Sequence, residues 1–426
     1  MTERDADLRS YYAATANWLR PFPPLAGHVE ADVAIVGGGY TGINAAIELT
    51  GRGFSVAIVE ARHVGWGCSG RNGGQVIGGI AAYGRLLRQL GKDDARTLWQ
   101  AGVDGLDIVY GRVRHFDIDC DLKMGYFDAA WSDRQMRELL RHHETQQSLG
   151  YPHALHVIGP DRLSSVIGTD AYVGGIIDTG SGHLHPLNLC LGEAAAAAAM
   201  GVRIFEHSPV TGLKSGSTPE IRTASGTLRA KHVVLAGNAY LEGVAPRLRQ
   251  YFLPVGSYLI ATEPLSPRLA AEVLPMDCAV CDQNTLLDYY RLSADRRLLF
   301  GGRCNHTGRE PRDIRGTLLP RMLKVFRQLR GVRVDYEWGG TVAFAPRRIP
   351  QLGRLNGNIL YAQGYSGHGI VASHVAGRLL AEAITGQAGG FDLLSRVKHW
   401  RFPGGKWFAT PALALGMTYY RLRDLL

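Results

Sequence analysis

Residues 31–61, ADVAIVGGGYTGINAAIELTGRGFSVAIVEA, constrain the fold more than any other stretch of this chain. The apolar, β-branched run from Ala31 to Val36 is typical of a buried parallel strand. Apolar residues at helical spacing follow, two glycines end that helix, and Ser55 to Val59 predicts a second buried strand. The order of these elements predicts a βαβ unit.

The turn between the first strand and the helix has the spacing G-x-G-x-x-G, formed by Gly37, Gly39 and Gly42. The first glycine would permit the tight turn, the second would let backbone approach a pyrophosphate, and the third would let helix and strand pack closely. The diphosphate would lie on the helix N-terminus. Glu60 ends the second strand, where its carboxylate can accept the hydroxyls of an adenosine ribose. Because the chain holds 54 glycines, the prediction of a dinucleotide site depends on this whole context and not on the motif alone.

A second glycine-rich segment, residues 65–75 (GWGCSGRNGGQ), follows the βαβ unit. Its glycines favour a loop whose backbone passes close to a flat, polar group. The βαβ unit and this loop together resemble the FAD-dependent amine and amino-acid oxidases of the D-amino-acid oxidase superfamily. Within it they resemble the branch of γ-glutamylputrescine oxidase and the bacterial L-pipecolate oxidases. Other segments that carry the resemblance span nearly the whole chain: 10–18, 181–189, 235–241, 286–292, 364–370 and 402–405.

The resemblance implies an α/β fold, with a Rossmann-like FAD-binding domain of the GR2 flavoprotein type and a substrate domain built on a mixed antiparallel sheet. We expect an N-terminal arm (1–30), a discontinuous FAD-binding domain (31–115, 183–245 and 340–390), a substrate-binding domain (116–182 and 246–339) and a C-terminal tail (391–426). Alternating apolar and polar residues after Tyr251 predict antiparallel strands with one buried face. Further predicted helices cover 80–114, 134–150, 161–167, 186–200 and 370–384, and further strands cover 118–127, 129–131, 202–205 with Val210, 231–236 and 358–362.

The cofactor implied by the resemblance is FAD. The sarcosine-oxidase branch attaches its flavin to a cysteine in the C-terminal part of the chain, and no cysteine follows Cys304 here, so we expect FAD to be bound noncovalently. The predicted cofactor-binding residues are Gly37, Gly39, Tyr40, Thr41, Gly42, Glu60, Ala61, Arg62, Cys68, Ser69, Gly70, Arg71, Asn72, Gly73, Gly74, Gln75, Val210, Gly237, Gly364, Gly367, His368, Gly369 and Ile370.

The resemblance also implies the reaction, in which a neutral amine gives hydride from its α-carbon to the flavin and leaves as an imine. Such chemistry requires substrate positioning more than an acid–base pair. We expect Tyr258, Arg291, Arg347, Arg348 and His368 to position the substrate, the arginines because a guanidinium suits a carboxylate. For the aromatic residues of the middle region, a place in the core is the competing interpretation.

The first substrate hypothesis is L-pipecolate or a similar cyclic imino acid, from lysine degradation, and the alternative is a polyamine derivative such as γ-glutamylputrescine. The electron acceptor would be oxygen or a membrane quinone. A flavin-dependent tRNA-modifying oxidoreductase and a non-enzymatic flavin scaffold are the rival classes. The net charge of +9 suits tRNA, but Lys and Arg are spread along the chain, so a solvated basic surface and no nucleic-acid partner are favoured.

Cysteine spacing bears on metals and on localisation. Cys278 and Cys281 form one C-x-x-C without a second pair at zinc spacing, so we expect no metal site and a reduced, cytoplasmic protein. We expect neither a signal peptide nor a membrane-spanning segment. His183 and His185 precede a predicted helix, where capping is favoured over substrate contact. Residues 400–426 mix aromatic, apolar and basic residues, which suits either peripheral contact with the inner face of the membrane or a terminal helix packed on the protein.

Overall fold

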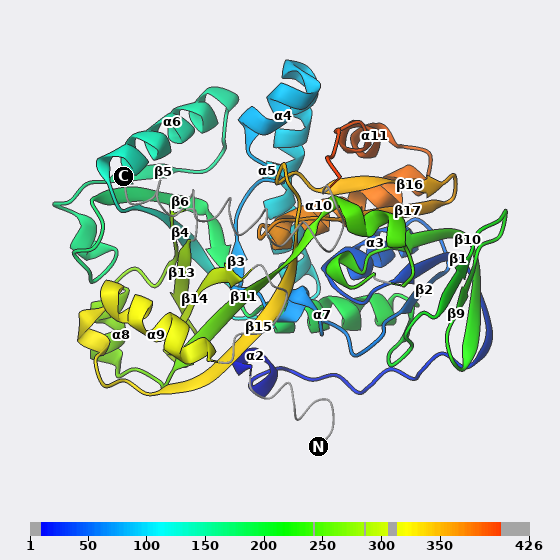
Figure 1. Cartoon of the computed structure of the whole chain (residues 1–426), viewed down its shortest axis with the longest axis horizontal. Helices are drawn as coiled ribbons and strands as arrows, with labels where there is room; N and C mark the ends of the chain where they lie inside the picture. Colours follow the sequence, from blue (N-terminus) through cyan, green and yellow to red (C-terminus); the bar gives the residue numbers. More distant parts are fainter. Residues whose placement is uncertain (1–9, 242, 285–286, 306–312, 402–426) are drawn as a thin grey trace.

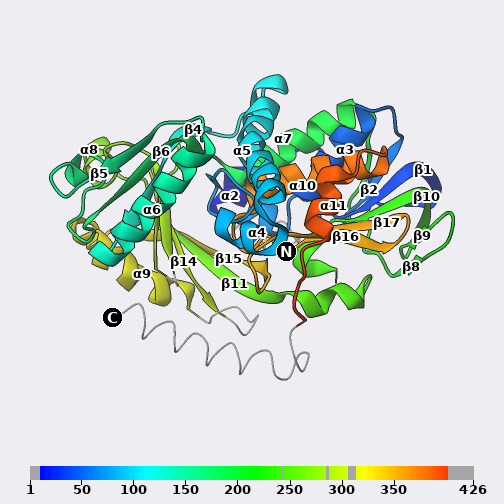
Figure 2. The same cartoon turned by 90° about the horizontal axis from the view of Figure 1, so that it is seen from above.

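The computed structural model describes residues 10–241, 243–284, 287–305 and 313–401 (Figure 1). Two β-sheets organise these residues, and helices α5 (Lys92–His115) and α10 (Gly369–Ile384) lie between them in both views (Figures 1 and 2). The first sheet carries the predicted βαβ unit, and the second contains the predicted antiparallel strands. An α/β fold with a mixed second sheet is therefore confirmed.

The first sheet is mostly parallel. In spatial order its strands are β16 (Gln351–Asn356), β17 (Ile359–Gln363), β10 (Gly226–Leu235), β1 (Gly27–Val36), β2 (Val56–Val59) and β7 (Arg203–Phe205), with β8 (Gly212–Lys214) and β9 (Glu220–Arg222) attached to β10. The central strand β1 pairs in parallel with β10 and β2, which places the carboxyl ends of all three strands at one edge. A ligand of an open parallel sheet lies outside that edge.

Helices cover one face of this sheet. Helices α3 (Tyr40–Thr50), α10 and α11 (Gly389–Ser395) pack against its strands. Helix α7 (Pro186–Ala199) packs against α3, α5 packs against α10, and α4 (Tyr83–Leu90) packs against α5. A Cβ on Gly377 of α10 would lie 2.8 Å from the backbone nitrogen of Ala45 in α3, so the two helices pack at backbone distance. Their apolar faces form one large buried core with β1 and β2.

The second sheet is mixed. Its strands, in spatial order, are β15 (Val334–Phe344), β11 (Leu253–Thr262), β14 (Leu298–Asn305), β13 (Asp288–Leu292), β12 (Ala279–Asp282), β4 (Lys123–Ala130), β6 (Gly174–His183) and β3 (Gln75–Val76), with β5 (Leu155–Ile158) beside β6. Helices α6 (Asp133–Leu149), α8 (Pro267–Val273) and α9 (Ile314–Val325) pack around it. The strands from β15 to β12 are antiparallel and β12 pairs in parallel with β4. The residue ranges predicted for the two domains stay a proposal. Strand β3 and the last residues of β15 belong to the second sheet, although the predicted ranges place them in the FAD-binding domain.

Several local predictions need correction. The single helix over 80–114 is two helices, because Gly91 has a φ of +85°, which interrupts the helical path. The predicted strands on either side of residue 128 are one strand, β4, which starts only at Lys123. The predicted helix over 161–167 is a 3-10 turn, Leu163–Ser165, and Val210 lies outside the strands.

Strand β6 was not predicted, because four of its ten residues are glycine, a residue depleted in strands. Packing explains these glycines: a Cβ on Gly175 would lie 2.2 Å from the carbonyl oxygen of Asp128, and one on Gly182 would lie 2.3 Å from that of Lys123.

The described part of the N-terminal arm packs on the body through α2 (Tyr11–Ala14). The Tyr12 side chain is fully buried, and the Tyr11 hydroxyl donates to Asp295 over 2.7 Å. Among the described residues, no helix is both long enough and apolar enough to cross a bilayer. Most of the tail predicted to contact a membrane, residues 402–426, lies outside the described residues.

Candidate active site

The glycine turn at the end of β1 forms a cradle whose geometry leaves no room for side chains. Gly37 has a φ of +113°, and a Cβ there would lie 2.9 Å from the carbonyl group of Ala236. A Cβ on Gly39 would lie 2.8 Å from the hydroxyl of Ser69. A Cβ on Gly42 would lie 2.0 Å from the carbonyl oxygen of Gly37, so α3 touches the turn that precedes it. The contacts of Gly37 and Gly42 agree with the tight turn and the close helix packing predicted for them, and the approach of a pyrophosphate at Gly39 stays a prediction.

The second glycine-rich segment is braced against the start of α3. The Tyr40 N–H donates to the Ser69 hydroxyl over 3.0 Å. The Asn72 amide donates to the carbonyls of Cys68 and Ser69, and it accepts from the Gly74 N–H over 2.8 Å. These bonds hold the loop across the N-terminus of α3, where the positive end of the helix dipole favours an anionic group.

Glu60 closes the other side of the cradle. Its carboxylate accepts the Gly38 N–H over 2.7 Å and the Arg62 N–H over 3.0 Å. Burial raises the pKa of Glu60, and these two backbone donors oppose the rise. The carboxylate is therefore fixed in position at the end of β2, beside the cavity.

A cavity of about 560 Å³ joins the cradle to both sheets. It extends from the carboxyl end of β2 to the start of α10 and to the strands β11, β13 and β14 of the second sheet. The predicted residues that line it are Gly37, Gly39, Tyr40, Thr41, Glu60, Ala61, Arg62, Cys68, Ser69, Arg71, Asn72, Gly73, Gln75, Val210, Gly237, Arg348, Gly367, His368, Gly369 and Ile370. Gly42, Gly70, Gly74 and Gly364 lie behind this lining.

The start of α10 faces the far end of the cavity. Gly367 has a φ of +96°, and α10 begins two residues later at Gly369. The hydroxyls of Tyr365 and Thr41 are 2.7 Å apart, which ties this loop to the start of α3. The unpaired N–H groups at the start of α10 can therefore face negative charge in the cavity.

His368 lies in the same loop and is exposed to the cavity. Partial removal of the imidazole from water lowers the pKa of His368, because the charged form loses hydration, and the positive charges of Arg348 and Arg85 lower this pKa further. The imidazole is therefore neutral near pH 7, where it can donate one hydrogen bond and accept another.

Arg291 does not take the predicted role of substrate anchor. It is 2% exposed and does not line the cavity. Its guanidinium donates to the carbonyls of Gly73 (3.0 Å), Leu184 (2.8 Å) and Leu292 (3.1 Å) and to the Tyr12 hydroxyl (3.2 Å). Arg291 therefore holds the glycine loop, β13 and the N-terminal arm together.

Tyr258 also lies elsewhere than predicted. Alternate residues of β11 face opposite sides, so Val255 and Ser257 line the cavity while Tyr258 packs into the core of the second sheet. Among the aromatic residues of the middle region, Tyr289 lines the cavity, and its hydroxyl lies 3.1 Å from that of Ser257. A Cβ on Gly301 would lie 2.3 Å from this ring, so a glycine there makes room for Tyr289.

The two neighbouring arginines of the predicted anchor separate in the structure. Arg348 lines the cavity and has a φ of +50°, a left-handed turn that directs it away from its neighbour. Arg347 does not line the cavity, and its guanidinium lies 4.6 Å from the centre of the Trp400 ring. Of the predicted arginine anchors, only Arg348 can reach a ligand in the cavity.

Some lining residues were missed by the sequence analysis. Trp66 and Tyr240 pack edge to face with ring centres 5.4 Å apart, and Phe344, Leu287 and Cys281 add apolar surface. For the lining residues that lie in strands, such as Ser257, the alternation of sides along the strand was the available signal, since it separates Ser257 from Tyr258. The remote partners of each strand were not visible in the sequence.

His185 caps α7 by accepting the Asn188 N–H over 3.1 Å, as predicted, and burial lowers the pKa of His185 to about 3. Among the described residues, Cys278 and Cys281 are free thiols, and no group of three potential metal ligands is present.

The residues present fit flavin adenine dinucleotide. The cradle would hold the pyrophosphate against the start of α3, Glu60 would lie at the ribose, and the start of α10 would lie at the flavin. The same cavity continues past these groups to Ser257 and Tyr289, whose side chains could contact a second ligand.

Comparisons with known proteins agree with this geometry. Residues 32–383 match the family model described as FAD dependent oxidoreductase, DAO. The chain is similar to the γ-glutamylputrescine oxidoreductase of Escherichia coli K12, with 42% identity over 431 residues that cover 100% of each chain. It is 39% identical to a probable oxidoreductase of Haemophilus influenzae, over 98% of this chain and 97% of the other.

Solved structures show the same fold. The crystal structure of glycine oxidase from Geobacillus kaustophilus superposes with a TM-score of 0.73 at 22% identity, over 88% of this chain and 100% of that one. L-proline dehydrogenase from P. horikoshii gives a TM-score of 0.71 at 18% identity, over 87% of this chain and 96% of that one.

Proposed function

We propose, from the premise that the chain belongs to the DAO family of FAD-dependent oxidoreductases, that it oxidises the terminal amine of a γ-glutamylputrescine-type substrate. The full-length identity of 42% to a γ-glutamylputrescine oxidoreductase carries this proposal. The names of the relatives favour this substrate over L-pipecolate and over tRNA. L-pipecolate therefore enters the test as a competitor.

FAD, when bound in the cavity, would supply the hydride acceptor. A carbon–hydrogen bond of the substrate breaks with its electron pair, the amine loses a proton to solvent, and the product is an imine that water can hydrolyse. The chain has to orient the amine, for which the Ser257 and Tyr289 hydroxyls are the polar groups of the wall. The start of α10 would stabilise negative charge that develops on the reduced ring.

Arg348 is the proposed anchor for the other end of the substrate. A γ-glutamyl group ends in a carboxylate, and a guanidinium binds a carboxylate through two parallel hydrogen bonds. Hydrogen bonds to charged groups contribute about 1.5–3 kcal/mol, which corresponds to roughly 10- to 100-fold in affinity. Arg348 should therefore matter for γ-glutamylputrescine and much less for putrescine, which has no carboxylate.

The direct test is anaerobic bleaching of the flavin absorbance by γ-glutamylputrescine, putrescine, L-pipecolate and L-proline. We expect γ-glutamylputrescine to bleach the flavin fastest, and faster bleaching by L-pipecolate would reverse the substrate assignment. Reoxidation by oxygen or by a soluble quinone then identifies the acceptor.

Arg348→Met should raise the KM for γ-glutamylputrescine about tenfold or more, as expected for a lost charged hydrogen bond. Arg347→Met is the matched control, since Arg347 is the adjacent cation outside the cavity. An unchanged KM in Arg348→Met would show that the anchor is misplaced.

A further inference from the structure

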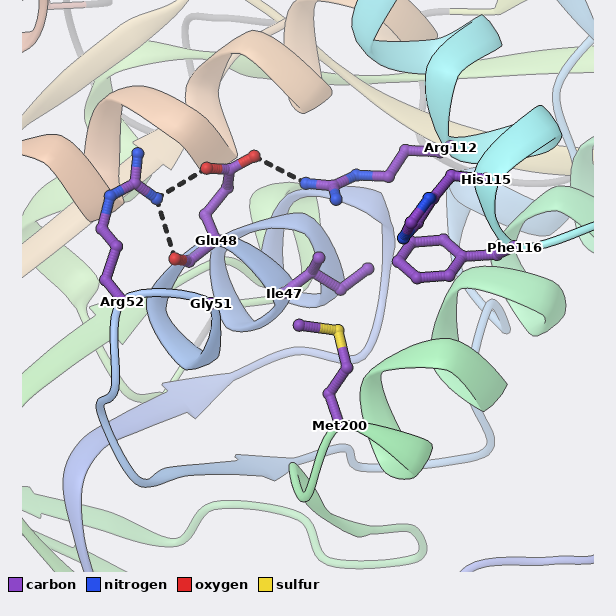
Figure 3. Close-up of a pocket in the computed structure, with 8 residues that line it drawn as sticks. All are labelled: Ile47, Glu48, Gly51, Arg52, Arg112, His115, Phe116 and Met200. Atoms are coloured by element: carbon purple, nitrogen blue, oxygen red, sulfur yellow. Dashed lines mark hydrogen bonds and ion pairs between the residues drawn. The ribbon is translucent and has the colours of Figure 1, made fainter.

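A second cavity, of about 440 Å³, lies at the C-terminal end of α3, where α3, α5 and the end of α7 meet (Figure 3). We call it the α3 hollow. Its lining residues are Ile47, Glu48, Gly51, Arg52, Arg112, His115, Phe116 and Met200. The first residue of α3 that lines the hollow, Ile47, lies seven residues after Tyr40, so about 10 Å of helix separates the hollow from the start of α3 at the glycine cradle. The α3 hollow is therefore separate from the FAD and substrate site.

The polar side of the α3 hollow carries more positive than negative charge. Glu48 lies between two arginines, with its carboxylate 2.6 Å from Arg52 on one side and 2.6 Å from Arg112 on the other (Figure 3). Arg52 also donates to the carbonyl oxygen of Glu48 over 2.8 Å, which covers the negative end of α3. One carboxylate facing two guanidiniums leaves a net charge of +1.

Arg112 keeps unused hydrogen-bonding capacity. Its side chain is 15% exposed, and it donates to Glu48. Its buried Nε–H has no acceptor within the part of the chain that the structure describes. A guanidinium offers five N–H donors in one plane. Because Nε is buried and one Nη group is bound to Glu48, a second anion would bind at the remaining Nη group of Arg112 without releasing Glu48.

The other side of the α3 hollow is apolar. Ile47 of α3, Phe116 after α5 and Met200 at the end of α7 form this wall, as Figure 3 shows. Met200 is 37% exposed, one of the few large apolar side chains of the described residues that face solvent. An apolar wall beside an incompletely paired arginine suits a ligand that has both a charged end and a hydrocarbon body.

We propose that the α3 hollow binds a small organic anion with an apolar body, such as a carboxylate of medium chain length. The carboxylate would pair with the remaining Nη group of Arg112, and the hydrocarbon chain of the ligand would cover Phe116 and Met200. Such a ligand would contact α3, which begins in the glycine cradle, and α5, which packs against α10.

Calorimetric titration of the FAD-loaded protein with hexanoate tests the proposal. Acetate has the charge without the hydrocarbon body, and hexanol has the body without the charge. We expect hexanoate to bind and both controls to bind at least about tenfold more weakly, because each lacks one half of the recognition. Equal binding of acetate would reduce the site to an unspecific anion contact and overturn the proposal, as would failure of hexanoate to bind.

Variants locate the binding. Arg112→Gln should weaken hexanoate binding about tenfold or more, as for a lost charged hydrogen bond. Arg114→Gln is the matched control, because Arg114 is an exposed arginine of the same helix that does not line the hollow. If Arg112→Gln does not fold, Met200→Glu replaces it, since this exposed position can accept a carboxylate that repels the ligand.

Arg348→Met separates the α3 hollow from the substrate cavity. Loss of hexanoate binding in Arg348→Met, together with retention in Arg112→Gln, would place the ligand in the substrate cavity and overturn the proposal. Flavin bleaching by amines is measured in parallel on the same preparations. It reports on the proposed function independently, so failure of one does not hide failure of the other.

Discussion

Gly42 gives the sharpest test of the FAD site, because its surroundings are defined on both sides. A Cβ at this position would lie 2.0 Å from the Gly37 carbonyl oxygen and 3.1 Å from Cγ2 of Ile35. An ordinary contact between carbon and oxygen is more than about 3 Å, so Gly42→Ala must push α3 away from the cradle by roughly 1 Å. The nearest obstacle, the Gly37 carbonyl oxygen, belongs to the backbone, so it cannot move aside as a flexible side chain would.

The magnitude follows from two opposing effects. Overpacking costs about 1–3 kcal/mol, and alanine gains about 1 kcal/mol over glycine inside a helix. We therefore expect a net loss of up to about 2 kcal/mol in the free energy of unfolding. FAD affinity should fall by about tenfold or more, because a displacement of the cradle worth 1.4 kcal/mol already corresponds to a factor of ten.

Gly111→Ala is the matched control. Gly111 lies inside helix α5, and a Cβ there would meet nothing within 4 Å. This variant should be neutral or more stable by up to about 1 kcal/mol. Titration of the apoprotein with FAD, followed by flavin fluorescence, gives the affinity, and thermal unfolding gives the stability. If Gly42→Ala matches Gly111→Ala in both measurements, the close contact between α3 and the cradle does not exist.

Three further predictions concern single side chains. Glu60→Arg should lower FAD affinity, measured by the same titration, because it removes the carboxylate at the ribose; unchanged affinity would contradict the placement of the ribose. Arg291→Met should destabilise the protein by about 3 kcal/mol or more in thermal unfolding, because the carbonyls of Gly73, Leu184 and Leu292 lose their donor. A change in KM alone would instead restore Arg291 as a substrate anchor. Burial raises the pKa of Asp128 from 3.8 to about 7, so its contribution to stability is greatest below pH 4 and is lost as the pH rises through 7. The melting temperature of Asp128→Asn relative to the parent protein should therefore rise between pH 5 and pH 8, because the parent loses stability over this range. The same difference in melting temperature at both pH values would show that this carboxyl ionises normally.

The glycine cradle was predictable from the sequence, because its requirements are local. Gly42 meets Gly37 and Ile35, which are close to it in the chain, and Gly37 meets Ala236 just after the adjoining strand β10. Only Gly39 meets a more remote residue, Ser69 of the second glycine-rich segment. The apolar runs that flank these glycines have the period of one strand or one helix. The family resemblance extended this local pattern to FAD. The parallel order of β1, β2 and β10 then places the carboxyl ends of these strands, and with them the cradle, at one edge.

The lining of the cavity near Ser257 and Tyr289 was decided by the tertiary structure. Tyr258 and Arg291 have the chemistry of substrate-binding residues, but one faces the core of the second sheet and the other is surrounded by carbonyls from distant segments. A left-handed turn at Arg348 separates it from Arg347. Composition and spacing specify which chemical groups are available, whereas the side of a strand that faces the cavity depends on the strands beside it. Those neighbours are remote in the chain, so the sequence alone determines the FAD cradle, and only the packing of the two sheets determines which side chains line the rest of the cavity.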